Sequence, residues 1–529
     1  MIKSIGFENY KAFSNGMLEI KPITVLLGAN SSGKSSILQL LLVLEQTLNL
    51  SEKYQSALKL NGHYVGMGEP INLFMDRNTE KPLVLKFGIN VKDFSKKFDS
   101  EYSEMVSDFE YLFLYYYIKD DNYQKEFNGW CKRRNLDISD SFFSNFKKSS
   151  MPVSFLERYV EEHMKKYTNI QIDELVDQYN RLTSIHHVLY DTLHTQRGES
   201  EITVQYRIRF MNNRLETFSF GLFYQNKKII DYQYVKDNNE PFSSDYFKIN
   251  KQDNKRVIYF RCLEPVFDTS SQLDSLVPEY EYKLILIAYS LVKQSFDSDK
   301  ISYISPLRAS PQRYYLLDES NDTHRLFSNN GTSLAEILKY QQELNQDVNG
   351  WLDRYGLSIE VKEFKDIINN IKVSQNGNSL DITDVGFGVS QVLPIVVQCF
   401  LSKEDSLTII EQPEIHLHPK IQADLTDLFI DVAKKNYNGR HKSFIIETHS
   451  EYIIKRLRMK MATNQISPLD VAVYFIEPRD GRSLNGAQLK RIPISEIGEI
   501  EWPNDYYVES FTDDVEYIKA IMKKRKNDK

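Results

Sequence analysis

Cysteine is scarce in this sequence: the 529 residues include three, Cys131, Cys262 and Cys399. They lie far apart and in no spacing typical of metal ligands, which argues against a zinc site or a disulfide framework and fits a reducing cytosol. Apolar runs of the roughly 20 residues that a membrane span needs are absent, and the first residues do not resemble a signal peptide. We therefore expect a cytoplasmic protein without membrane contact.

The sequence also has no excess of basic residues: it contains 66 Lys and Arg against 73 Asp and Glu, and its net charge is −7. Any nucleic-acid contact must then come from a local patch, such as 132–134 or the tail 523–526, although runs of this kind are more often solvated loops. Glycine is sparse, whereas Tyr and Phe are plentiful. The composition is that of a globular protein, and the length predicts roughly two to four structural units.

The clearest motif is Gly-Ala-Asn-Ser-Ser-Gly-Lys-Ser at 28–35, which lies between an apolar β-branched run at 23–27 and a helical pattern from 36 onward. Glycines in such a loop let the backbone wrap around phosphate oxygens at the positive end of a helix. We expect Lys34 to reach the β and γ phosphates and Ser35 to offer its hydroxyl to Mg²⁺. The motif predicts ATP and Mg²⁺ as cofactors. The predicted phosphate-binding residues are Gly28, Asn30, Ser31, Ser32, Gly33, Lys34, Ser35 and Ser36.

ATP hydrolysis also needs a second acidic strand end near the metal and a residue that positions water. The apolar run 407–410 ends in Glu411, as expected of a central parallel strand whose carboxyl end faces Mg²⁺. We expect Glu411 to serve the metal together with Ser35. In the segment that follows, His416 and His418 are predicted to lie in a turn packed under the site rather than to ligate a metal.

Two further segments complete the predicted site. The apolar strand pattern at 443–448 delivers His449, which we expect to hydrogen-bond the γ-phosphate. The segment 384–391 places glycine and serine at the start of an apolar helix, which is again an anion-binding arrangement. One triphosphate does not need two such loops from one chain, so we expect the second loop to cap ATP held by a second copy. The residues predicted to act across that interface are Gly388, Ser390 and Gln391.

Strand-like alternation at 83–91 resumes at 202–210 and 218–224, and predicts neighbouring strands of one antiparallel sheet. The stretch between them is rich in aromatic and charged residues at helical spacing, and is interpreted as a helical insertion whose aromatic stripes form a core or a partner-docking face. The predicted fold is α/β: a mixed sheet flanked by helices, an antiparallel β subdomain and the insertion. The predicted parts are the N-terminal head with the phosphate loop (1–94), the insertion (95–197), antiparallel strands and helices (198–300) and a C-terminal lobe (301–529).

These motifs resemble the ATP-binding-cassette-like ATPases related to structural-maintenance and Rad-type DNA-repair proteins. In that resemblance, 28–35 looks like the Walker A loop, 384–391 the signature motif, 407–412 the Walker B strand and His449 the switch histidine. A narrower set of segments resembles the bacterial antiphage-defence ATPases of the Septu type, the PtuA-like ATPases, including those encoded beside retrons. These segments are 61–62, 306–315, 385–394, 411–419 and 501–503.

The resemblance implies a homodimer or higher assembly that works with a separate HNH nuclease of the PtuB type. It further implies, for retron-associated members, a reverse transcriptase and its RNA-linked DNA as partners. On this interpretation ATP and Mg²⁺ clamp two subunits, and the clamped assembly holds the nuclease inactive.

Two departures from the cassette pattern bear on the chemistry. Gln412 stands where the usual catalytic glutamate is found, and an amide can orient water but cannot accept its proton at neutral pH. We therefore expect slow hydrolysis, or Glu414 as the replacement base. The segment 386–391 also differs from Leu-Ser-Gly-Gly-Gln, which leaves open whether Ser390 or the backbone at Gly388 meets the γ-phosphate.

The main alternative is an ATPase that is itself a nuclease, like the overcoming-lysogenization-defect family. Residues 451–529 lack the Glu-Gly turn and spaced acidic residues that would bind a metal pair, which disfavours it. A chromosome-organising or Rad50-like protein would need long heptad arms, which the sequence does not contain. For Arg308 and Arg313, a structural role and a partner contact both stay open.

Overall fold

The computed structural model describes most of the chain in two compact units. The first comprises residues 1–86, 209–216 and 293–529, and the second comprises 87–208 and 217–292. Cys131, the basic run 132–134 and the segment from 502 to the C-terminus lie outside the described residues. The described residues are 2–50, 56–119, 125, 172–194, 200–234, 242–249, 258–267, 277–316, 326, 331–364, 367–375, 377–434, 441–479 and 486–501.

The first unit is built on a six-stranded mixed sheet with the order β11-β16-β17-β3-β18-β19. The first five strands pair in parallel and β19 is antiparallel to β18. Strands β3, β16 and β17 are buried along their whole length, as apolar β-branched runs covered on both faces should be. Their carboxyl ends consequently meet at one edge. The strands are β3 (Ile23–Gly28), β11 (Ile301–Ile304), β16 (Leu407–Glu411), β17 (Ser443–Glu447), β18 (Val471–Glu477) and β19 (Gln488–Ile492).

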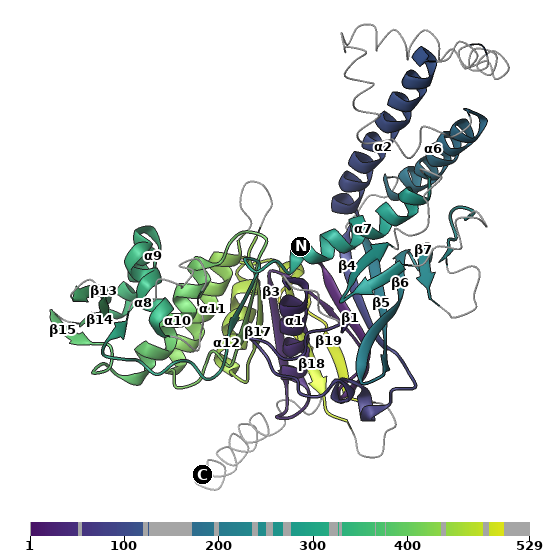
Figure 1. The fold of residues 1–529 in the computed structure, drawn as a ribbon. Helices are drawn as coiled ribbons and strands as arrows, with labels where there is room; N and C mark the ends of the chain where they lie inside the picture. Colours follow the sequence, from purple (N-terminus) through teal and green to yellow (C-terminus); the bar gives the residue numbers. More distant parts are fainter. Residues whose placement is uncertain are drawn as a thin grey trace. The chain divides into compact units, whose positions relative to one another are not determined.

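Helices leave this edge directly after the strands (Figure 1). Helix α1 (Lys34–Leu48) follows β3, α11 (Pro419–Ala433) follows β16, and α12 (Glu451–Ala462) follows β17. Helix α10 (Phe387–Leu401) precedes β16, and its apolar residues share one core with α11, α12 and the sheet. Strands β3, β16 and β17 are thus each followed by a turn and a helix, the arrangement that places ligands at the carboxyl edge of a parallel sheet.

The remainder of the first unit includes two smaller layers. Strands β1 and β2 form an antiparallel hairpin, and β12 to β15 form a four-stranded sheet beside α8 and α9. Their bounds are β1 (Ser4–Tyr10), β2 (Phe13–Glu19), β12 (Tyr315–Leu316), β13 (Leu357–Phe364), β14 (Ile368–Gln375), β15 (Asn378–Asp381), α8 (Gly331–Tyr340) and α9 (Gln342–Leu352). Short 3₁₀ turns are η1 (Pro70–Leu73), η2 (Met75–Arg77), η5 (Asp353–Tyr355) and η6 (Pro468–Asp470).

In the second unit, β4, β5 and β6 are neighbours in a sheet that continues through β7 and β8, which confirms the sheet expected from the alternating runs. Helices α2 and α6 lie side by side, because Asp99 Oδ1 and Oδ2 of α2 lie 3.3 and 3.4 Å from Nε2 of His186 and His194 on α6 (Figure 1). The elements are β4 (Leu83–Asn90), β5 (Glu201–Met211), β6 (Arg214–Tyr224), β7 (Lys227–Gln233), β8 (Phe242–Ser243), β9 (Ile258–Arg261), β10 (Glu264–Phe267), α2 (Val91–Lys119), α6 (Ile172–His194) and α7 (Val277–Ser295).

The expected α/β fold class, with a mixed sheet and further antiparallel strands, is confirmed. Of the predicted insertion 95–197, the described residues other than 125 lie in α2 and α6, and 126–171 lie outside the described residues. None of the described helices combines the length and apolar character that crossing a membrane requires.

Leucine-to-alanine substitutions test where the first unit derives its stability. Leu425 of α11 is fully buried, whereas Leu469 is 79% exposed. We expect Leu425→Ala to destabilise the protein by about 2–5 kcal/mol through lost burial and a residual cavity, and Leu469→Ala to change stability by less than about 0.5 kcal/mol. Thermal unfolding midpoints measure both, and equal midpoints for the two variants would contradict the packing described.

Candidate nucleotide-binding site

The loop between β3 and α1 has backbone angles that require glycine at two positions. Gly28 has φ 149° and Gly33 has φ 111°, in the region that side chains disfavour. A Cβ at Gly28 would lie 2.7 Å from the carbonyl oxygen of Ile476, and one at Gly33 would lie 2.8 Å from Cζ of Phe13. The loop is therefore held in a close-wrapped shape that other residues would disrupt.

The polar groups of this loop fit an anion. Lys34 is buried, and its Nζ donates hydrogen bonds to the carbonyl oxygens of Gly28 (3.1 Å) and Ala29 (2.9 Å). Ser32 Oγ is buried with no hydrogen-bond partner among the described residues, and no side chain caps the N-terminus of α1. An unpaired buried hydroxyl and an uncapped helix start are features that a phosphate group would satisfy. Asn30, Ser31 and Ser35 are exposed, and Ser36 is half-buried.

The expected metal pair is brought together. Glu411, the last residue of β16, is buried and accepts a hydrogen bond from Tyr303 Oη at 2.9 Å. Burial raises the pKa of Glu411, and the Tyr303 and Ser35 hydroxyls oppose this rise. A hydroxyl and a carboxylate side by side are oxygen ligands of the kind that Mg²⁺ prefers.

Glu447 is a site residue that the sequence analysis missed. It ends β17 in register with Glu411, and its Oε1 lies 3.5 Å from Lys34 Nζ and 3.8 Å from His449 Nε2. Burial raises its pKa to about 7; Lys34 opposes this, and Glu411 and Glu414 add to it. The missed signal was the repeated ending Ile-Ile-Glu, which β16 and β17 share and which parallel pairing places side by side.

The turn after β16 is fixed by hydrogen bonds at both ends. Gln412 has φ 45°; its N–H donates to the Glu447 carbonyl oxygen at 2.8 Å, and its carbonyl oxygen accepts from Arg308 Nη2 at 3.0 Å. Glu414 accepts from the Thr448 hydroxyl at 2.8 Å and from the His449 N–H at 2.7 Å. Its carboxylate thus joins the turn directly to the segment that carries the expected switch histidine.

Both histidines lie in the turn after β16, but they are exposed rather than packed under the site as expected. His418 Nδ1 accepts a hydrogen bond from the Lys420 N–H and caps α11, while His416 has a positive φ of 59°. His449 is partly exposed next to the carboxylates, and burial, followed by the charge of Lys34, lowers its pKa. Within the described ranges, no cluster of three His, Cys, Asp or Glu side chains could hold a metal ion.

The signature-like segment presents backbone rather than the side chains expected to cap a second nucleotide. Ser390 and Gln391 are buried in α10, 5% and 3% exposed, whereas Asp384 and Gly386 before the helix are exposed. Gly388 is half-buried beside the His416 carbonyl oxygen. Arg313 Nη2 holds the segment from outside by hydrogen bonds to both oxygens of Asp384 at 2.7 and 3.0 Å.

The sequence of the chain matches the model of a family described as the AAA ATPase domain over residues 1–454. The chain belongs to this family. The phosphate-loop motif, Glu411 and His449 all fall within the matched residues. Among curated proteins, none matches the sequence.

Two solved structures are similar to this AAA ATPase. One is the SMC head domain from Thermotoga maritima, with 8% identity, a TM-score of 0.34, and coverage of 93% of this chain and 99% of that chain. The other is the Smc head domain with a coiled coil and joint derived from Pyrococcus yayanosii, with 10% identity, a TM-score of 0.29, and coverage of 94% and 98%.

The raised pKa of Glu447 predicts a pH-dependent contribution to stability. A glutamate titrates near about 4.3 in an unfolded chain, so between there and about 7 the folded protein holds a proton that the unfolded chain has lost. The free energy of unfolding should therefore fall as the pH rises through this window, and Glu447→Gln should remove that fall.

Thermal midpoints of wild type and Glu447→Gln, measured without nucleotide or Mg²⁺ from about pH 5 to about pH 8, test this expectation. The variant should gain relative to wild type as the pH rises. Glu499→Gln, which alters an exposed carboxylate, is the control and should track the wild type. Parallel curves for all three proteins would exclude the expected effect.

Proposed function

We propose that this AAA ATPase is a nucleotide-dependent switch that binds ATP with Mg²⁺ at the 28–35 loop and hydrolyses it slowly. The observation that carries the proposal is the parallel register that ends β16 in the buried Glu411 and β17 in Glu447, whose Oε1 lies 3.5 Å from Nζ of Lys34 at the start of α1. Lys34 would bind the β and γ phosphates, the loop N–H groups would hold the phosphate oxygens, and Ser35 and Glu411 would hold the metal. Mg²⁺, when bound, offsets the negative charge of those oxygens.

Slow hydrolysis follows in this proposal from Gln412. The backbone of Gln412 is bound on both sides, by Glu447 and Arg308, so its side chain starts from a fixed point at the strand end. From there the amide can orient a water molecule but cannot take its proton. Long residence of ATP would then favour a switch over a motor, with His449 placed to sense the γ-phosphate.

We also propose that a second copy of the chain completes the site. The exposed 384–386 segment leads into α10, whose first N–H groups can meet an anion. Because Ser390 and Gln391 are buried in their own chain, the backbone around Gly388 is the better candidate for contact with the other copy's γ-phosphate. A mass measurement with ATP, with ADP and without nucleotide tests this dimer; a monomer under saturating ATP and Mg²⁺ would refute it.

For the biological role, we propose that the ATP-bound assembly restrains a separate HNH nuclease in antiphage defence. A retron reverse transcriptase with its RNA-linked DNA would be a further partner, and residues 95–197 would supply a docking element. Support comes from the resemblance of the 306–315 and 411–419 segments to Septu-type ATPases. Copurification with the products of neighbouring genes tests it, and an assembly unaffected by removal of ATP would contradict the gating.

Lys34→Ala should weaken ATP binding by about tenfold to a hundredfold, because a charge-assisted contact to phosphate contributes roughly 1.5–3 kcal/mol. Titration calorimetry measures the affinity. Lys455→Ala is the matched control, since Lys455 is an exposed lysine of α12 that pairs only with Glu451 among the contacts described. Equal ATP affinity of Lys34→Ala and Lys455→Ala would refute the proposed site.

Gln412→Glu places a carboxylate at the strand end and should raise the turnover of ATP by about tenfold or more, given the usual contribution of a positioned base. Phosphate release under saturating ATP measures it. Gln342→Glu, an exposed amide-to-acid change on α9, is the control and should not accelerate hydrolysis. An unchanged or lower rate for Gln412→Glu would show that the amide does not limit turnover.

A further inference from the structure

The carboxylate of Glu414 is occupied on both oxygens by one neighbouring segment. Oε2 accepts the Thr448 hydroxyl at 2.8 Å and Oε1 accepts the His449 N–H at 2.7 Å. Thr448 is fully buried, its N–H donates to the Leu26 carbonyl oxygen in β3, and its hydroxyl also accepts from the Ser450 N–H at 2.9 Å. Glu414 therefore binds the segment 448–449, which is itself hydrogen-bonded to β3, the strand before the phosphate loop.

Gln422 of α11 makes a second bridge between the same two segments. Its Nε2 donates to the carbonyl oxygens of Leu417 (2.8 Å) and Glu414 (3.4 Å), while its Oε1 accepts from Ser450 Oγ at 2.6 Å. The turn 412–418 and the segment 448–450 are thus joined by two side chains, one acidic and one amide. Neither segment can shift without breaking hydrogen bonds to the other.

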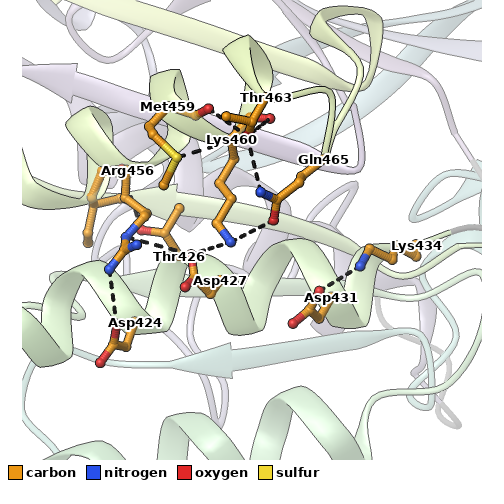
Figure 2. A network of polar contacts seen from close by, with 11 residues as sticks. Asp424, Thr426, Asp427, Asp431, Lys434, Arg456, Met459, Lys460, Thr463 and Gln465 are labelled. Atoms are coloured by element: carbon orange, nitrogen blue, oxygen red, sulfur yellow. Dashed lines mark hydrogen bonds and ion pairs between the residues drawn. The ribbon is translucent and has the colours of Figure 1, made fainter.

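The connection continues along the helices that the two segments begin. Figure 2 shows the contacts between α11 and α12: Arg456 Nη2 lies 3.2 Å from Asp424 Oδ1, and Lys460 Nζ lies 3.2 Å from Asp427 Oδ1. Glu414, Gln422 and the ion pairs between the helices therefore all join the chain from 412 through α11 to the chain from 448 through α12. His449 thus lies in a segment held by several contacts rather than in a free loop.

The Glu414 carboxylate is the acceptor in both of its hydrogen bonds, with the Thr448 hydroxyl and the His449 N–H. Arg308 is buried beside it: burial lowers the pKa of Arg308 to about 10, and the charge of Glu414 opposes that shift. Proton transfer to Glu414 would weaken its bonds to Thr448 and His449, because a protonated oxygen is a poor acceptor. A general base must be free to take a proton from water, which is the opposite requirement.

From this geometry we infer that Glu414 is a positioning residue that fixes His449 toward the γ-phosphate, and is not the general base of hydrolysis. The inference rests on the proposed ATP site and deepens it by separating two roles that the sequence leaves open for one carboxylate. Gln can replace Glu in this role, since its Oε1 can accept from the His449 N–H and its Nε2 can donate to Thr448 Oγ1. Ala cannot.

The test compares Glu414→Gln with Glu414→Ala in ATP turnover and in the ratio of ATP to ADP affinity. We expect Glu414→Gln to keep turnover within about threefold of wild type, and Glu414→Ala to lower turnover and the ATP preference by about tenfold with ADP affinity unchanged. Thr448→Val, which removes the hydroxyl partner, should lower the ATP preference in the same direction. The double variant Glu414→Ala with Thr448→Val should lose less ATP preference than the two single variants lose in sum, as expected of residues in one hydrogen-bond network.

The outcomes separate cleanly. If Glu414→Gln abolishes turnover while ATP affinity is kept, Glu414 is the base and the inference falls; it also falls if Glu414→Ala keeps the wild-type ATP-to-ADP ratio. If Glu414→Ala fails to fold, Glu414→Gln and Thr448→Val decide. The proposed function itself would be refuted if Lys34→Ala and Lys455→Ala bound ATP with equal affinity. That comparison does not involve Glu414, so the two failures can be distinguished.

Discussion

Parallel pairing of β3, β16 and β17 is the constraint on which the site depends. Because Glu411 pairs with Glu447 and Glu447 pairs with Leu26, two carboxylates and the phosphate loop must meet at the same edge of the sheet. Glu411 and Glu447 are both largely removed from water, and Lys34 lies between the loop carbonyls and Glu447. Buried carboxylates this close repel each other unless cations offset them, which gives Lys34 an electrostatic role beyond contact with phosphate.

Burial at this edge explains why so many of its groups have shifted pKa values. Burial raises the pKa of Glu411 and Glu447 and lowers that of Arg308 and His449, so desolvation is the first cause in all four. Arg308 Nε and Nη1 have no hydrogen-bond partner within the part of the chain that the structure describes, although Nη2 binds the turn. A dry edge of this kind strengthens every charged contact made there, including those with a phosphate.

The parts of the site that the sequence predicted are those written in consecutive residues. The 28–35 motif predicted a loop and a helix start, and the apolar run before Glu411 predicted a buried strand, because both patterns are local. Glu447 was not predicted as a site residue, because a glutamate at a strand end becomes informative only when the neighbouring strand and its register are known. Ser390 and Gln391 likewise lie at the start of an apolar helix, and sequence spacing does not say which face of that helix is buried. The sequence also did not distinguish the two arginines. In the structure Arg313 is exposed and donates to Asp384, whereas Arg308 is buried and donates to the Gln412 carbonyl oxygen.

Helices α11 and α12 are joined to each other and both begin at the candidate site. Each helix begins within a few residues of the nucleotide edge, at a cap supplied by the turn or the switch segment: His418 for α11 and Ser450 for α12. Glu414 and Gln422 join the segments that precede the two helices, and the ion pairs of Asp424 and Asp427 join the helices themselves (Figure 2). The segment that carries His449 is therefore held by hydrogen bonds to the turn after β16 and continues into a helix that is paired with α11.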